Sequence, residues 1–330
     1  MTVYYLIALI STFVLTAVCL RFLIPYLKSK KMGQKILEIG PRWHKSKEGT
    51  PTMGGLSFLF ALTTVLAVMF GYLFFTGRKD GLVFAVICLI FAVLNALIGM
   101  IDDRTKFAKN KNEGLLSWQK YLLQLCITVL FLAFSKHFGC IDTSLYIPFF
   151  KANIELGFAY YILAAVLITG VINSVNLADG IDGLASSETA VVAAFFSACA
   201  FLSASLPLGI MSGALLGACL GFLIYNFYPA RVFMGDTGSL FLGALVTSMS
   251  FMISNPLIIA VCGFMYILEA ISDILQVAYF KITKGKRLFK MAPIHHHFEK
   301  CGWSEIKIVS VFSLITLILC ALSFFLDIYR

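Results

Sequence analysis

Long apolar runs follow one another along almost the whole chain and are separated by short polar stretches. A helix needs about 20 mainly apolar residues to cross a hydrocarbon layer of ~30 Å. The pattern therefore predicts an all-α, polytopic integral membrane protein with about ten transmembrane helices. No polar stretch is long enough for a separate globular domain, so residues 1–330 are expected to form a single transmembrane domain. The helices are predicted at 3–27, 54–75, 82–101, 118–138, 157–175, 187–205, 207–228, 239–254, 257–283 and 305–328.

Basic residues orient the predicted bundle. They gather in the loops after the first, third and ninth runs, whereas the alternate loops carry few. Because positively charged loops stay on the cytoplasmic side, the odd-numbered loops are expected to be cytoplasmic and both termini extracytoplasmic. The residues behind this assignment are Lys28, Lys30, Lys31, Lys35, Arg42, Lys45, Lys47, Arg104, Lys106, Lys109, Lys111, Lys284, Lys286, Arg287, Lys290 and Lys300.

Composition argues against a nucleic-acid-binding protein and against a protein held together by metal-bound or disulfide-bonded cysteines. The chain is 60% hydrophobic with a formal net charge of +9, but its basic residues lie beside the ends of apolar runs. They form no patch interleaved with aromatic residues, so nucleic-acid binding is not expected. The nine cysteines lie mostly inside apolar runs and lack metal-ligand spacing. Neither a metal framework nor a disulfide framework is therefore predicted from them.

Five short polar motifs interrupt the apolar pattern. All five fall in odd-numbered loops, so the alternation of helices predicts that they share the cytoplasmic face. Carboxylates are costly beside a bilayer, and their gathering on one face predicts a functional site. In chain order the motifs are Lys45-Ser-Lys-Glu-Gly-Thr-Pro-Thr52, Asp102-Asp103, Asn176-Leu-Ala-Asp-Gly-Ile-Asp-Gly183, Phe233-Met-Gly-Asp236 and His295-His-His297.

The acidic motifs suggest a place for a cation. Asp102 and Asp103 are expected to close the third helix, where negative charge opposes the helix dipole at a cost of up to ~1 kcal/mol. A divalent metal or a lysine is expected to compensate for it. Asp236 precedes the eighth run, where it can cap a helix and also serve in catalysis. Phe233 can stack on a base or anchor the chain at the membrane interface.

The central motif has the spacing of a one-sided site. If this segment is helical, Asn176, Asp179 and Asp182 share a face through their i,i+3 spacing. Gly180 allows a ligand to approach the backbone closely. A calcium loop is disfavoured because the twelve-position pattern of oxygen ligands is absent.

Two further polar groups lie near the end of the chain. The histidines at 295–297 are flanked by basic residues, which favours anion binding over a zinc site. Glu269 and Asp273 lie inside the ninth run, where structural hydrogen bonding in the bundle is the favoured interpretation. Gln276, one turn nearer the cytoplasm, is the better candidate for contact with a substrate.

The motifs resemble, in content and order, those of the bacterial phospho-N-acetylmuramoyl-pentapeptide transferases, a family of polyprenyl-phosphate N-acetylhexosamine-1-phosphate transferases. One mild departure is Ala178, where relatives often have threonine. The histidine segment favours muramoyl-pentapeptide over the sibling substrates. The segments that carry the resemblance are Thr50-Pro-Thr-Met-Gly-Gly55, Asp102-Asp103, Asn176-Leu-Ala-Asp-Gly-Ile-Asp-Gly183, Phe233-Met-Gly-Asp-Thr-Gly238 and Ala292-Pro-Ile-His-His-His-Phe-Glu299.

This resemblance implies a Mg²⁺-dependent sugar-1-phosphate transferase of the EC 2.7.8 type in the bacterial inner membrane, with its active site facing the cytoplasm. Phospho-N-acetylmuramoyl-pentapeptide would pass from UDP-N-acetylmuramoyl-pentapeptide to undecaprenyl phosphate, giving lipid I and UMP for peptidoglycan synthesis. The family is usually homodimeric. Little covalent chemistry is needed in such a transfer, because positioning and charge neutralisation dominate.

The resemblance also assigns roles to residues of this chain. Catalytic roles fall to Asp102, Asp103, Asp236 and His295, and metal binding falls to Asp236 with Asp102 and Asp103 nearby. Phe233 is expected to stack on uracil, aided by Asn226, Asp182 and Gln276. Substrate binding as a whole is assigned to Lys47, Thr52, Lys120, Asn176, Asp179, Gly180, Asp182, Asn226, Phe233, Gln276, His296 and His297.

Both a direct and a two-step mechanism are open, and two other functions are considered. We favour direct attack by undecaprenyl phosphate, with Asp102 orienting or deprotonating it and His295 neutralising the pyrophosphate. A covalent aspartyl-phosphate intermediate is the other route. The sibling activity would transfer N-acetylglucosamine-1-phosphate instead. An ion-coupled transporter is disfavoured because only Glu269 and Asp273 lie deep within the predicted helices.

Overall fold

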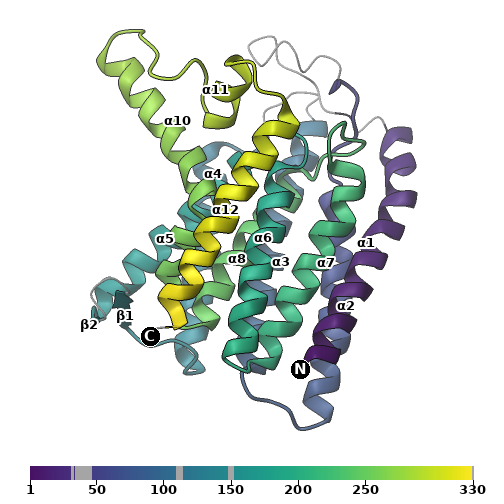
Figure 1. The fold of residues 1–330 in the computed structure, drawn as a ribbon, viewed down its shortest axis with the longest axis vertical. Helices are drawn as coiled ribbons and strands as arrows, with labels where there is room; N and C mark the ends of the chain where they lie inside the picture. The colour runs from purple at the N-terminus through teal and green to yellow at the C-terminus, as the bar shows by residue number, and fades with distance from the viewer. Residues whose placement is uncertain (31–32, 34–46, 109–113, 148–151, 329–330) are drawn as a thin grey trace.

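Figure 1 shows the computed structural model, a bundle of long helices that run side by side. The structure describes residues 1–30, 33, 47–108, 114–147 and 152–328. Both chain termini lie at the lower end of the bundle in this view, and the short helix α11 (Ile294–Lys300) lies at the upper end. Several basic residues used above to orient the bundle lie outside the described residues, namely Lys31, Lys35, Arg42, Lys45, Lys109 and Lys111.

The all-α prediction is confirmed, and each predicted run contains helix. A two-stranded antiparallel hairpin, β1 (Ser144–Ile147) with β2 (Ala152–Glu155), lies between α4 and α5 and was not predicted. The long helices are α1 (Thr2–Ser29), α2 (Gly55–Phe75), α3 (Leu82–Ala108), α4 (Ser117–His137), α5 (Phe158–Ala178), α6 (Leu184–Leu202), α7 (Leu206–Asn226), α8 (Gly235–Met252), α10 (Phe264–Ile282) and α12 (Glu305–Ile328).

Within the described residues, eight helices are long and apolar enough to cross a membrane. They are α1 to α7 and α12, and a bent pair that includes α10 brings the number to nine if it is counted as one span. Helix α8 is not among them, yet all its residues from Thr237 to Phe251 are buried. Its hydroxyl groups at Thr247, Ser248 and Ser250 donate to carbonyls of the same helix. Helix α8 can therefore be more polar because neighbouring helices shield it from lipid.

The ninth predicted helix, 257–283, is broken in the structure. A short 3-10 turn (Pro256–Ile258) leads into α9 (Ile259–Cys262), and α10 then leaves at 77° to that segment. Gly263 lies at the break, where its N–H donates to the carbonyl of Ile259. Helix α10 consequently leans out of the bundle toward the end that carries α11 (Figure 1).

The third helix is longer than predicted. The apolar run ends at residue 101, but α3 continues to Ala108. Asp102 and Asp103 therefore lie inside the helix and do not close it. Lys106 follows Asp102 by one turn, so a lysine of the same helix supplies the compensating positive charge.

Small residues let α1 and α7 approach closely. Gly209, Gly213, Gly217 and Gly221 form a stripe along α7, and a Cβ at Gly217 would lie only 2.1 Å from the carbonyl oxygen of Leu9 on α1. The same stripe meets Met1, Tyr5 and Phe13 along α1. Such stripes favour helix association in membranes, where packing rather than water exclusion holds helices together.

This packing predicts that Gly217→Ala destabilises the protein, although alanine is the better helix former. A Cβ with no room should cost about 1–3 kcal/mol through overpacking. The measurement is the thermal unfolding midpoint of the purified protein in detergent. Gly170→Ala is the matched control, because no heavy atom lies within 4 Å of a Cβ at that helical position. Helix propensity should leave this control unchanged or up to ~1 kcal/mol more stable. Equal midpoints for the two variants would contradict the close α1–α7 contact.

Candidate active site

Three carboxylates from two helices meet at one end of the bundle. Asp102 and Asp103 come from α3 and Asp236 from the first turn of α8, and one oxygen of each lies within 4.8 Å of the others. Asp103 accepts hydrogen bonds from the backbone N–H of Asp236 (3.1 Å), from that of Thr237 (2.9 Å) and from the Thr237 hydroxyl (2.6 Å). These N–H groups belong to the first turn of α8, where backbone donors have no acceptor within the helix. Asp103 supplies that acceptor.

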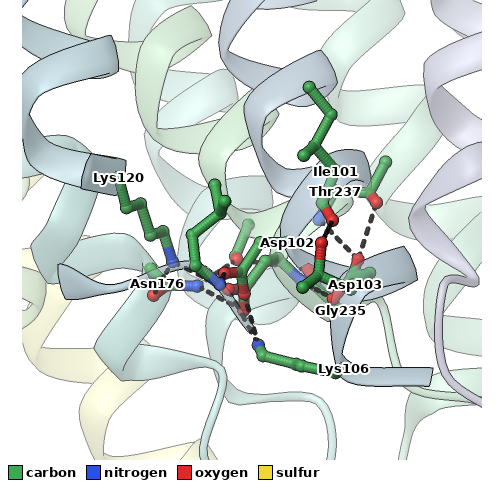
Figure 2. Close-up of polar contacts among 12 residues, drawn as sticks. Ile101, Asp102, Asp103, Lys106, Lys120, Asn176, Gly235 and Thr237 are labelled. Atoms are coloured by element: carbon green, nitrogen blue, oxygen red, sulfur yellow. Dashed lines mark hydrogen bonds and ion pairs between the residues drawn. The ribbon is translucent and has the colours of Figure 1, made fainter. Parts of the chain in front are cut away.

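Two lysines reach this acidic cluster from two sides, as Figure 2 shows. The ammonium of Lys106 lies 2.7 Å from an oxygen of Asp102 and 3.0 Å from Asp236. The ammonium of Lys120, from α4, lies 2.7 Å from the same Asp236 oxygen. Lys120 was predicted in the site, whereas Lys106 was assigned only to topology. Its i,i+4 spacing from Asp102 was the available signal, and it was missed because the helix was expected to stop at residue 101.

Asn176 connects the central motif to the acids. Its amide N–H donates to Asp236 (3.1 Å) and to the hydroxyl of Ser239 (2.7 Å), while its oxygen accepts from Lys120 (3.2 Å). Asp179 follows at the end of α5, half-buried. Burial, together with neighbouring carboxylates of which Asp236 has the largest effect, raises the pKa of Asp179 well above its usual range.

A second ion-pair group ties the basic loop to the central motif. The Lys47 ammonium lies 2.6 Å from Asp182 and 2.6 Å from Glu305 at the start of α12. The backbone N–H of Asp182 also donates to Glu305, and the other Asp182 oxygen accepts from the N–H of Ala230. Lys47 and Asp182 were predicted to bind substrate, and here they bind each other. Glu305 was not predicted, because an acid at the start of a membrane helix is ordinary in sequence.

The three histidines differ in their surroundings. His295 is buried, with Nδ1 3.0 Å from Glu269 on α10. The Nδ1 atom of His296 lies 2.6 Å from Glu299, and His297 accepts from the backbone N–H of Lys290. His295 thus faces the helix bundle, whereas His296 and His297 bond within α11 and its loop.

The residues expected around the nucleoside lie in supporting positions. Phe233 is half-buried in a turn whose backbone bonds to Pro51 and Gly54. Asn226, at the end of α7, donates to the carbonyl of Val232 in the loop before Phe233 and accepts from Ser186 on α6, so its amide ties that loop to the bundle.

Gln276 and Thr52 complete the predicted set. Gln276 accepts from the N–H groups of Leu288 and Phe289 and donates to the carbonyl of Phe289, so it holds the basic loop after α10. Thr52 lies beside the acidic cluster, because a Cβ at Gly235 would meet both its hydroxyl (3.0 Å) and Asp103 (2.8 Å). Contact of any of these residues with a substrate stays a prediction.

The acidic cluster fits a hard divalent cation. Its donors are carboxylate oxygens, which Mg²⁺ prefers, and no sulfur or imidazole ligand belongs to the group. When ionised, three carboxylates face two ammonium groups, which leaves one negative charge uncompensated. Mg²⁺ usually takes one or two protein carboxylates and completes its shell with water and substrate phosphates.

Comparison with known proteins gives concordant matches. The family model described as glycosyl transferase family 4 matches residues 83–254, and the model described as phospho-N-acetylmuramoyl-pentapeptide-transferase signature 1 matches residues 47–59. Similar relatives carry the name phospho-N-acetylmuramoyl-pentapeptide-transferase. The relative from Clostridium perfringens is 45% identical over 317 residues, covering 96% of this chain and 95% of the relative.

Two further relatives agree with this result. The protein of Clostridium acetobutylicum is 46% identical over 304 residues, covering 91% of this chain and 92% of the relative. That of Caldicellulosiruptor bescii is 41% identical over 319 residues, covering 96% of both chains. With this identity over nearly its full length, the chain belongs to the phospho-N-acetylmuramoyl-pentapeptide transferase family.

Proposed function

We propose that this protein transfers phospho-N-acetylmuramoyl-pentapeptide from UDP-N-acetylmuramoyl-pentapeptide to undecaprenyl phosphate, giving lipid I and UMP in peptidoglycan synthesis. The observation that carries the proposal is the cluster of Asp102, Asp103 and Asp236 with Lys106 and Lys120 at one end of a membrane-spanning bundle. Transfer between two phosphate esters requires acids that hold a cation and, beside them, ammonium groups that hold phosphate. The names of the full-length relatives support the particular substrates.

The chain's own residues suit direct attack by the lipid phosphate on the donor diphosphate. Lys106 and Lys120 lie where they can exchange an Asp236 oxygen for a phosphate oxygen with little movement. Asp102 orients the acceptor phosphate at the membrane edge. The second proton of a phosphate monoester leaves near pH 6, so at neutral pH orientation contributes more than proton removal. His295 faces the diphosphate and neutralises charge on it.

A magnesium ion would be held mainly by Asp236, with Asp102 and Asp103 beside it. When bound, such an ion supplies charge stabilisation to the leaving UMP. Asn176 supports this arrangement, because its N–H donates to the Asp236 oxygen that the lysines leave free. Asp103 contributes less directly, since both its oxygens already accept hydrogen bonds from the start of α8.

The proposed setting is the bacterial inner membrane, with the acidic cluster at the cytoplasmic face and both termini outside. Basic residues near the motif loops support this orientation. A homodimer is expected by resemblance to the family. The lipid acceptor would then approach from the cytoplasmic leaflet, beside the ends of α3 and α4 that carry Lys106 and Lys120.

Donor choice tests the function. Purified protein with undecaprenyl phosphate and Mg²⁺ should transfer radiolabel from UDP-N-acetylmuramoyl-pentapeptide into lipid and release UMP. Little or no label should pass from UDP-N-acetylglucosamine under the same conditions. Comparable rates with the two donors would assign the protein to the sibling activity, and transfer from neither would refute the proposal.

Removing the central carboxylate tests the metal site. Asp236→Asn takes away the charge that two lysines share and that the metal would use, so turnover should fall roughly a hundredfold or more, the scale seen when one charge-stabilising group is lost. Binding of Mn²⁺ as a spectroscopic substitute, measured by electron paramagnetic resonance without substrate, should weaken in parallel. The control is Asp80→Asn, an exposed acid in the loop before α3. Full turnover of Asp236→Asn at ordinary Mg²⁺ would remove Asp236 from this role.

Cysteine labelling tests the orientation. In a background without the native cysteines, Lys286→Cys probes the loop after α10 and Lys79→Cys probes the loop before α3, both at exposed positions. An impermeant thiol reagent should modify only the cysteine at 79 in spheroplasts and only the one at 286 in inverted vesicles. The opposite pattern would place the acidic cluster outside the cytoplasm.

A further inference from the structure

One buried hydrogen bond joins α10 to the histidine motif. His295 is the second residue of α11, and both its ring and the Glu269 side chain are fully buried. Its Nδ1 lies 3.0 Å from Glu269 Oε2, and its backbone nitrogen lies 3.4 Å from the same oxygen. A carboxylate that is ionised can only accept, so the hydrogen of this bond belongs to Nδ1.

The other ring nitrogen points toward the central motif. The Nε2 atom of His295 is buried and has no hydrogen-bond partner among the described residues. A Cβ at Gly180 would lie 2.3 Å from it, so the ring rests against the backbone next to Asp179. Gly180 was expected to let a ligand approach the backbone, and the His295 ring occupies that space instead. A buried polar atom without a partner costs about 1–3 kcal/mol. In the imidazolium form Nε2 also carries a hydrogen, which a bound substrate oxygen can accept.

A second buried acid lies near Glu269. Glu188, on α6, lies close enough for the two carboxylates to repel, and neither of its oxygens has a partner in the described structure. The nearby hydroxyl of Tyr266 bonds to Thr189 instead. Two buried carboxylates are costly to ionise together. Of the two acids, only Glu269 meets N–H donors in the described structure.

We propose that Glu269 is a positioning residue for the reaction: it accepts the Nδ1–H of a His295 imidazolium and so fixes the ring with its Nε2–H toward the donor diphosphate. This assignment of the diphosphate rests on the proposed function, whereas the ring orientation does not. Glu269 itself touches no substrate. Histidines that bind metals show the same positioning principle, because a carboxylate on one ring nitrogen sets the direction of the other.

A double-mutant cycle tests the coupling. Glu269→Ala and His295→Asn should each slow transfer about ten- to a hundredfold, the range for loss of a group that orients a functional histidine. The double variant should be no more than about twofold slower than His295→Asn, because residues that act as a unit are not additive. Glu269→Gln keeps an oxygen that accepts from Nδ1–H and should be roughly tenfold faster than Glu269→Ala.

Asp273→Ala is the matched control, since it removes an acid one turn further along α10 that is partly exposed. In the double variant, the fold-loss in transfer rate caused by Asp273→Ala, whatever its size, should multiply with the fold-loss caused by His295→Asn. If the loss caused by Glu269→Ala persists in full in the His295→Asn background, or if Glu269→Gln is no faster than Glu269→Ala, Glu269 acts elsewhere and the proposal is wrong.

A second measurement needs neither substrate nor a working enzyme. Nitrogen-15 NMR of histidine-labelled protein, with the His295 signals assigned by their loss in His295→Asn, reports which ring nitrogen carries hydrogen. The expected result is a protonated Nδ1 in the native protein and in Glu269→Gln. A bare Nδ1 with hydrogen only on Nε2 would overturn the proposal. This result stands even if the protein transfers no sugar phosphate, so the two failures are distinguishable.

Discussion

The site depends on the bond between Asp103 and the start of α8. This carboxylate, contributed by α3, caps the first N–H groups of α8, and the Gly99 position next to it leaves no room for a side chain against the Asp236 carbonyl. The helix N-terminus carries partial positive charge, so an acid there is favourable by up to ~2 kcal/mol when partly buried. The same bond fixes where Asp236 emerges. The same contact therefore sets both the geometry of the acidic cluster and the packing of α3 against α8.

Charge at the membrane edge is arranged before any substrate arrives. Lys106 and Lys120 share one Asp236 oxygen, and Lys47 joins Asp182 to Glu305. Removing one partner of a buried pair typically costs about 3–5 kcal/mol because the other charge is stranded. The ammonium groups are thus held in place by acids, and a phosphate can take the place of such an acid. Such preorganisation is what charge stabilisation in catalysis requires.

Support for the site comes from hydrogen bonds within the chain. Asn226 and Gln276 hold the loops that present Phe233 and the basic segment, and Glu269 holds His295. The bend after α9 directs α10 outward, which brings Glu269 beneath α11. The irregular ninth span is therefore part of the site's architecture.

The sequence by itself determined the membrane class, the position of nearly every helix and the motifs that carry acids, lysines and histidines. Hydrophobicity is a local property, so the apolar runs locate α1 to α7 and α12 without reference to one another. The prediction wrongly ended the third helix at residue 101. The apolar run stops there, whereas α3 continues through polar residues to Ala108. The hairpin of β1 and β2 was missed because its four-residue strands carry little periodic signal.

Only the tertiary structure decided which of those side chains act together. Asp103 and Thr237 are 134 residues apart, Lys47 and Glu305 are 258 apart, and each pair meets through helix packing that no local pattern encodes. Helix packing likewise brought Lys106 to Asp236 and made Lys47 and Asp182 partners. Glu269 looked like a structural acid in the sequence. Its contact with His295 exists because the short helix α11 packs against α10, with the two residues 26 apart along the chain.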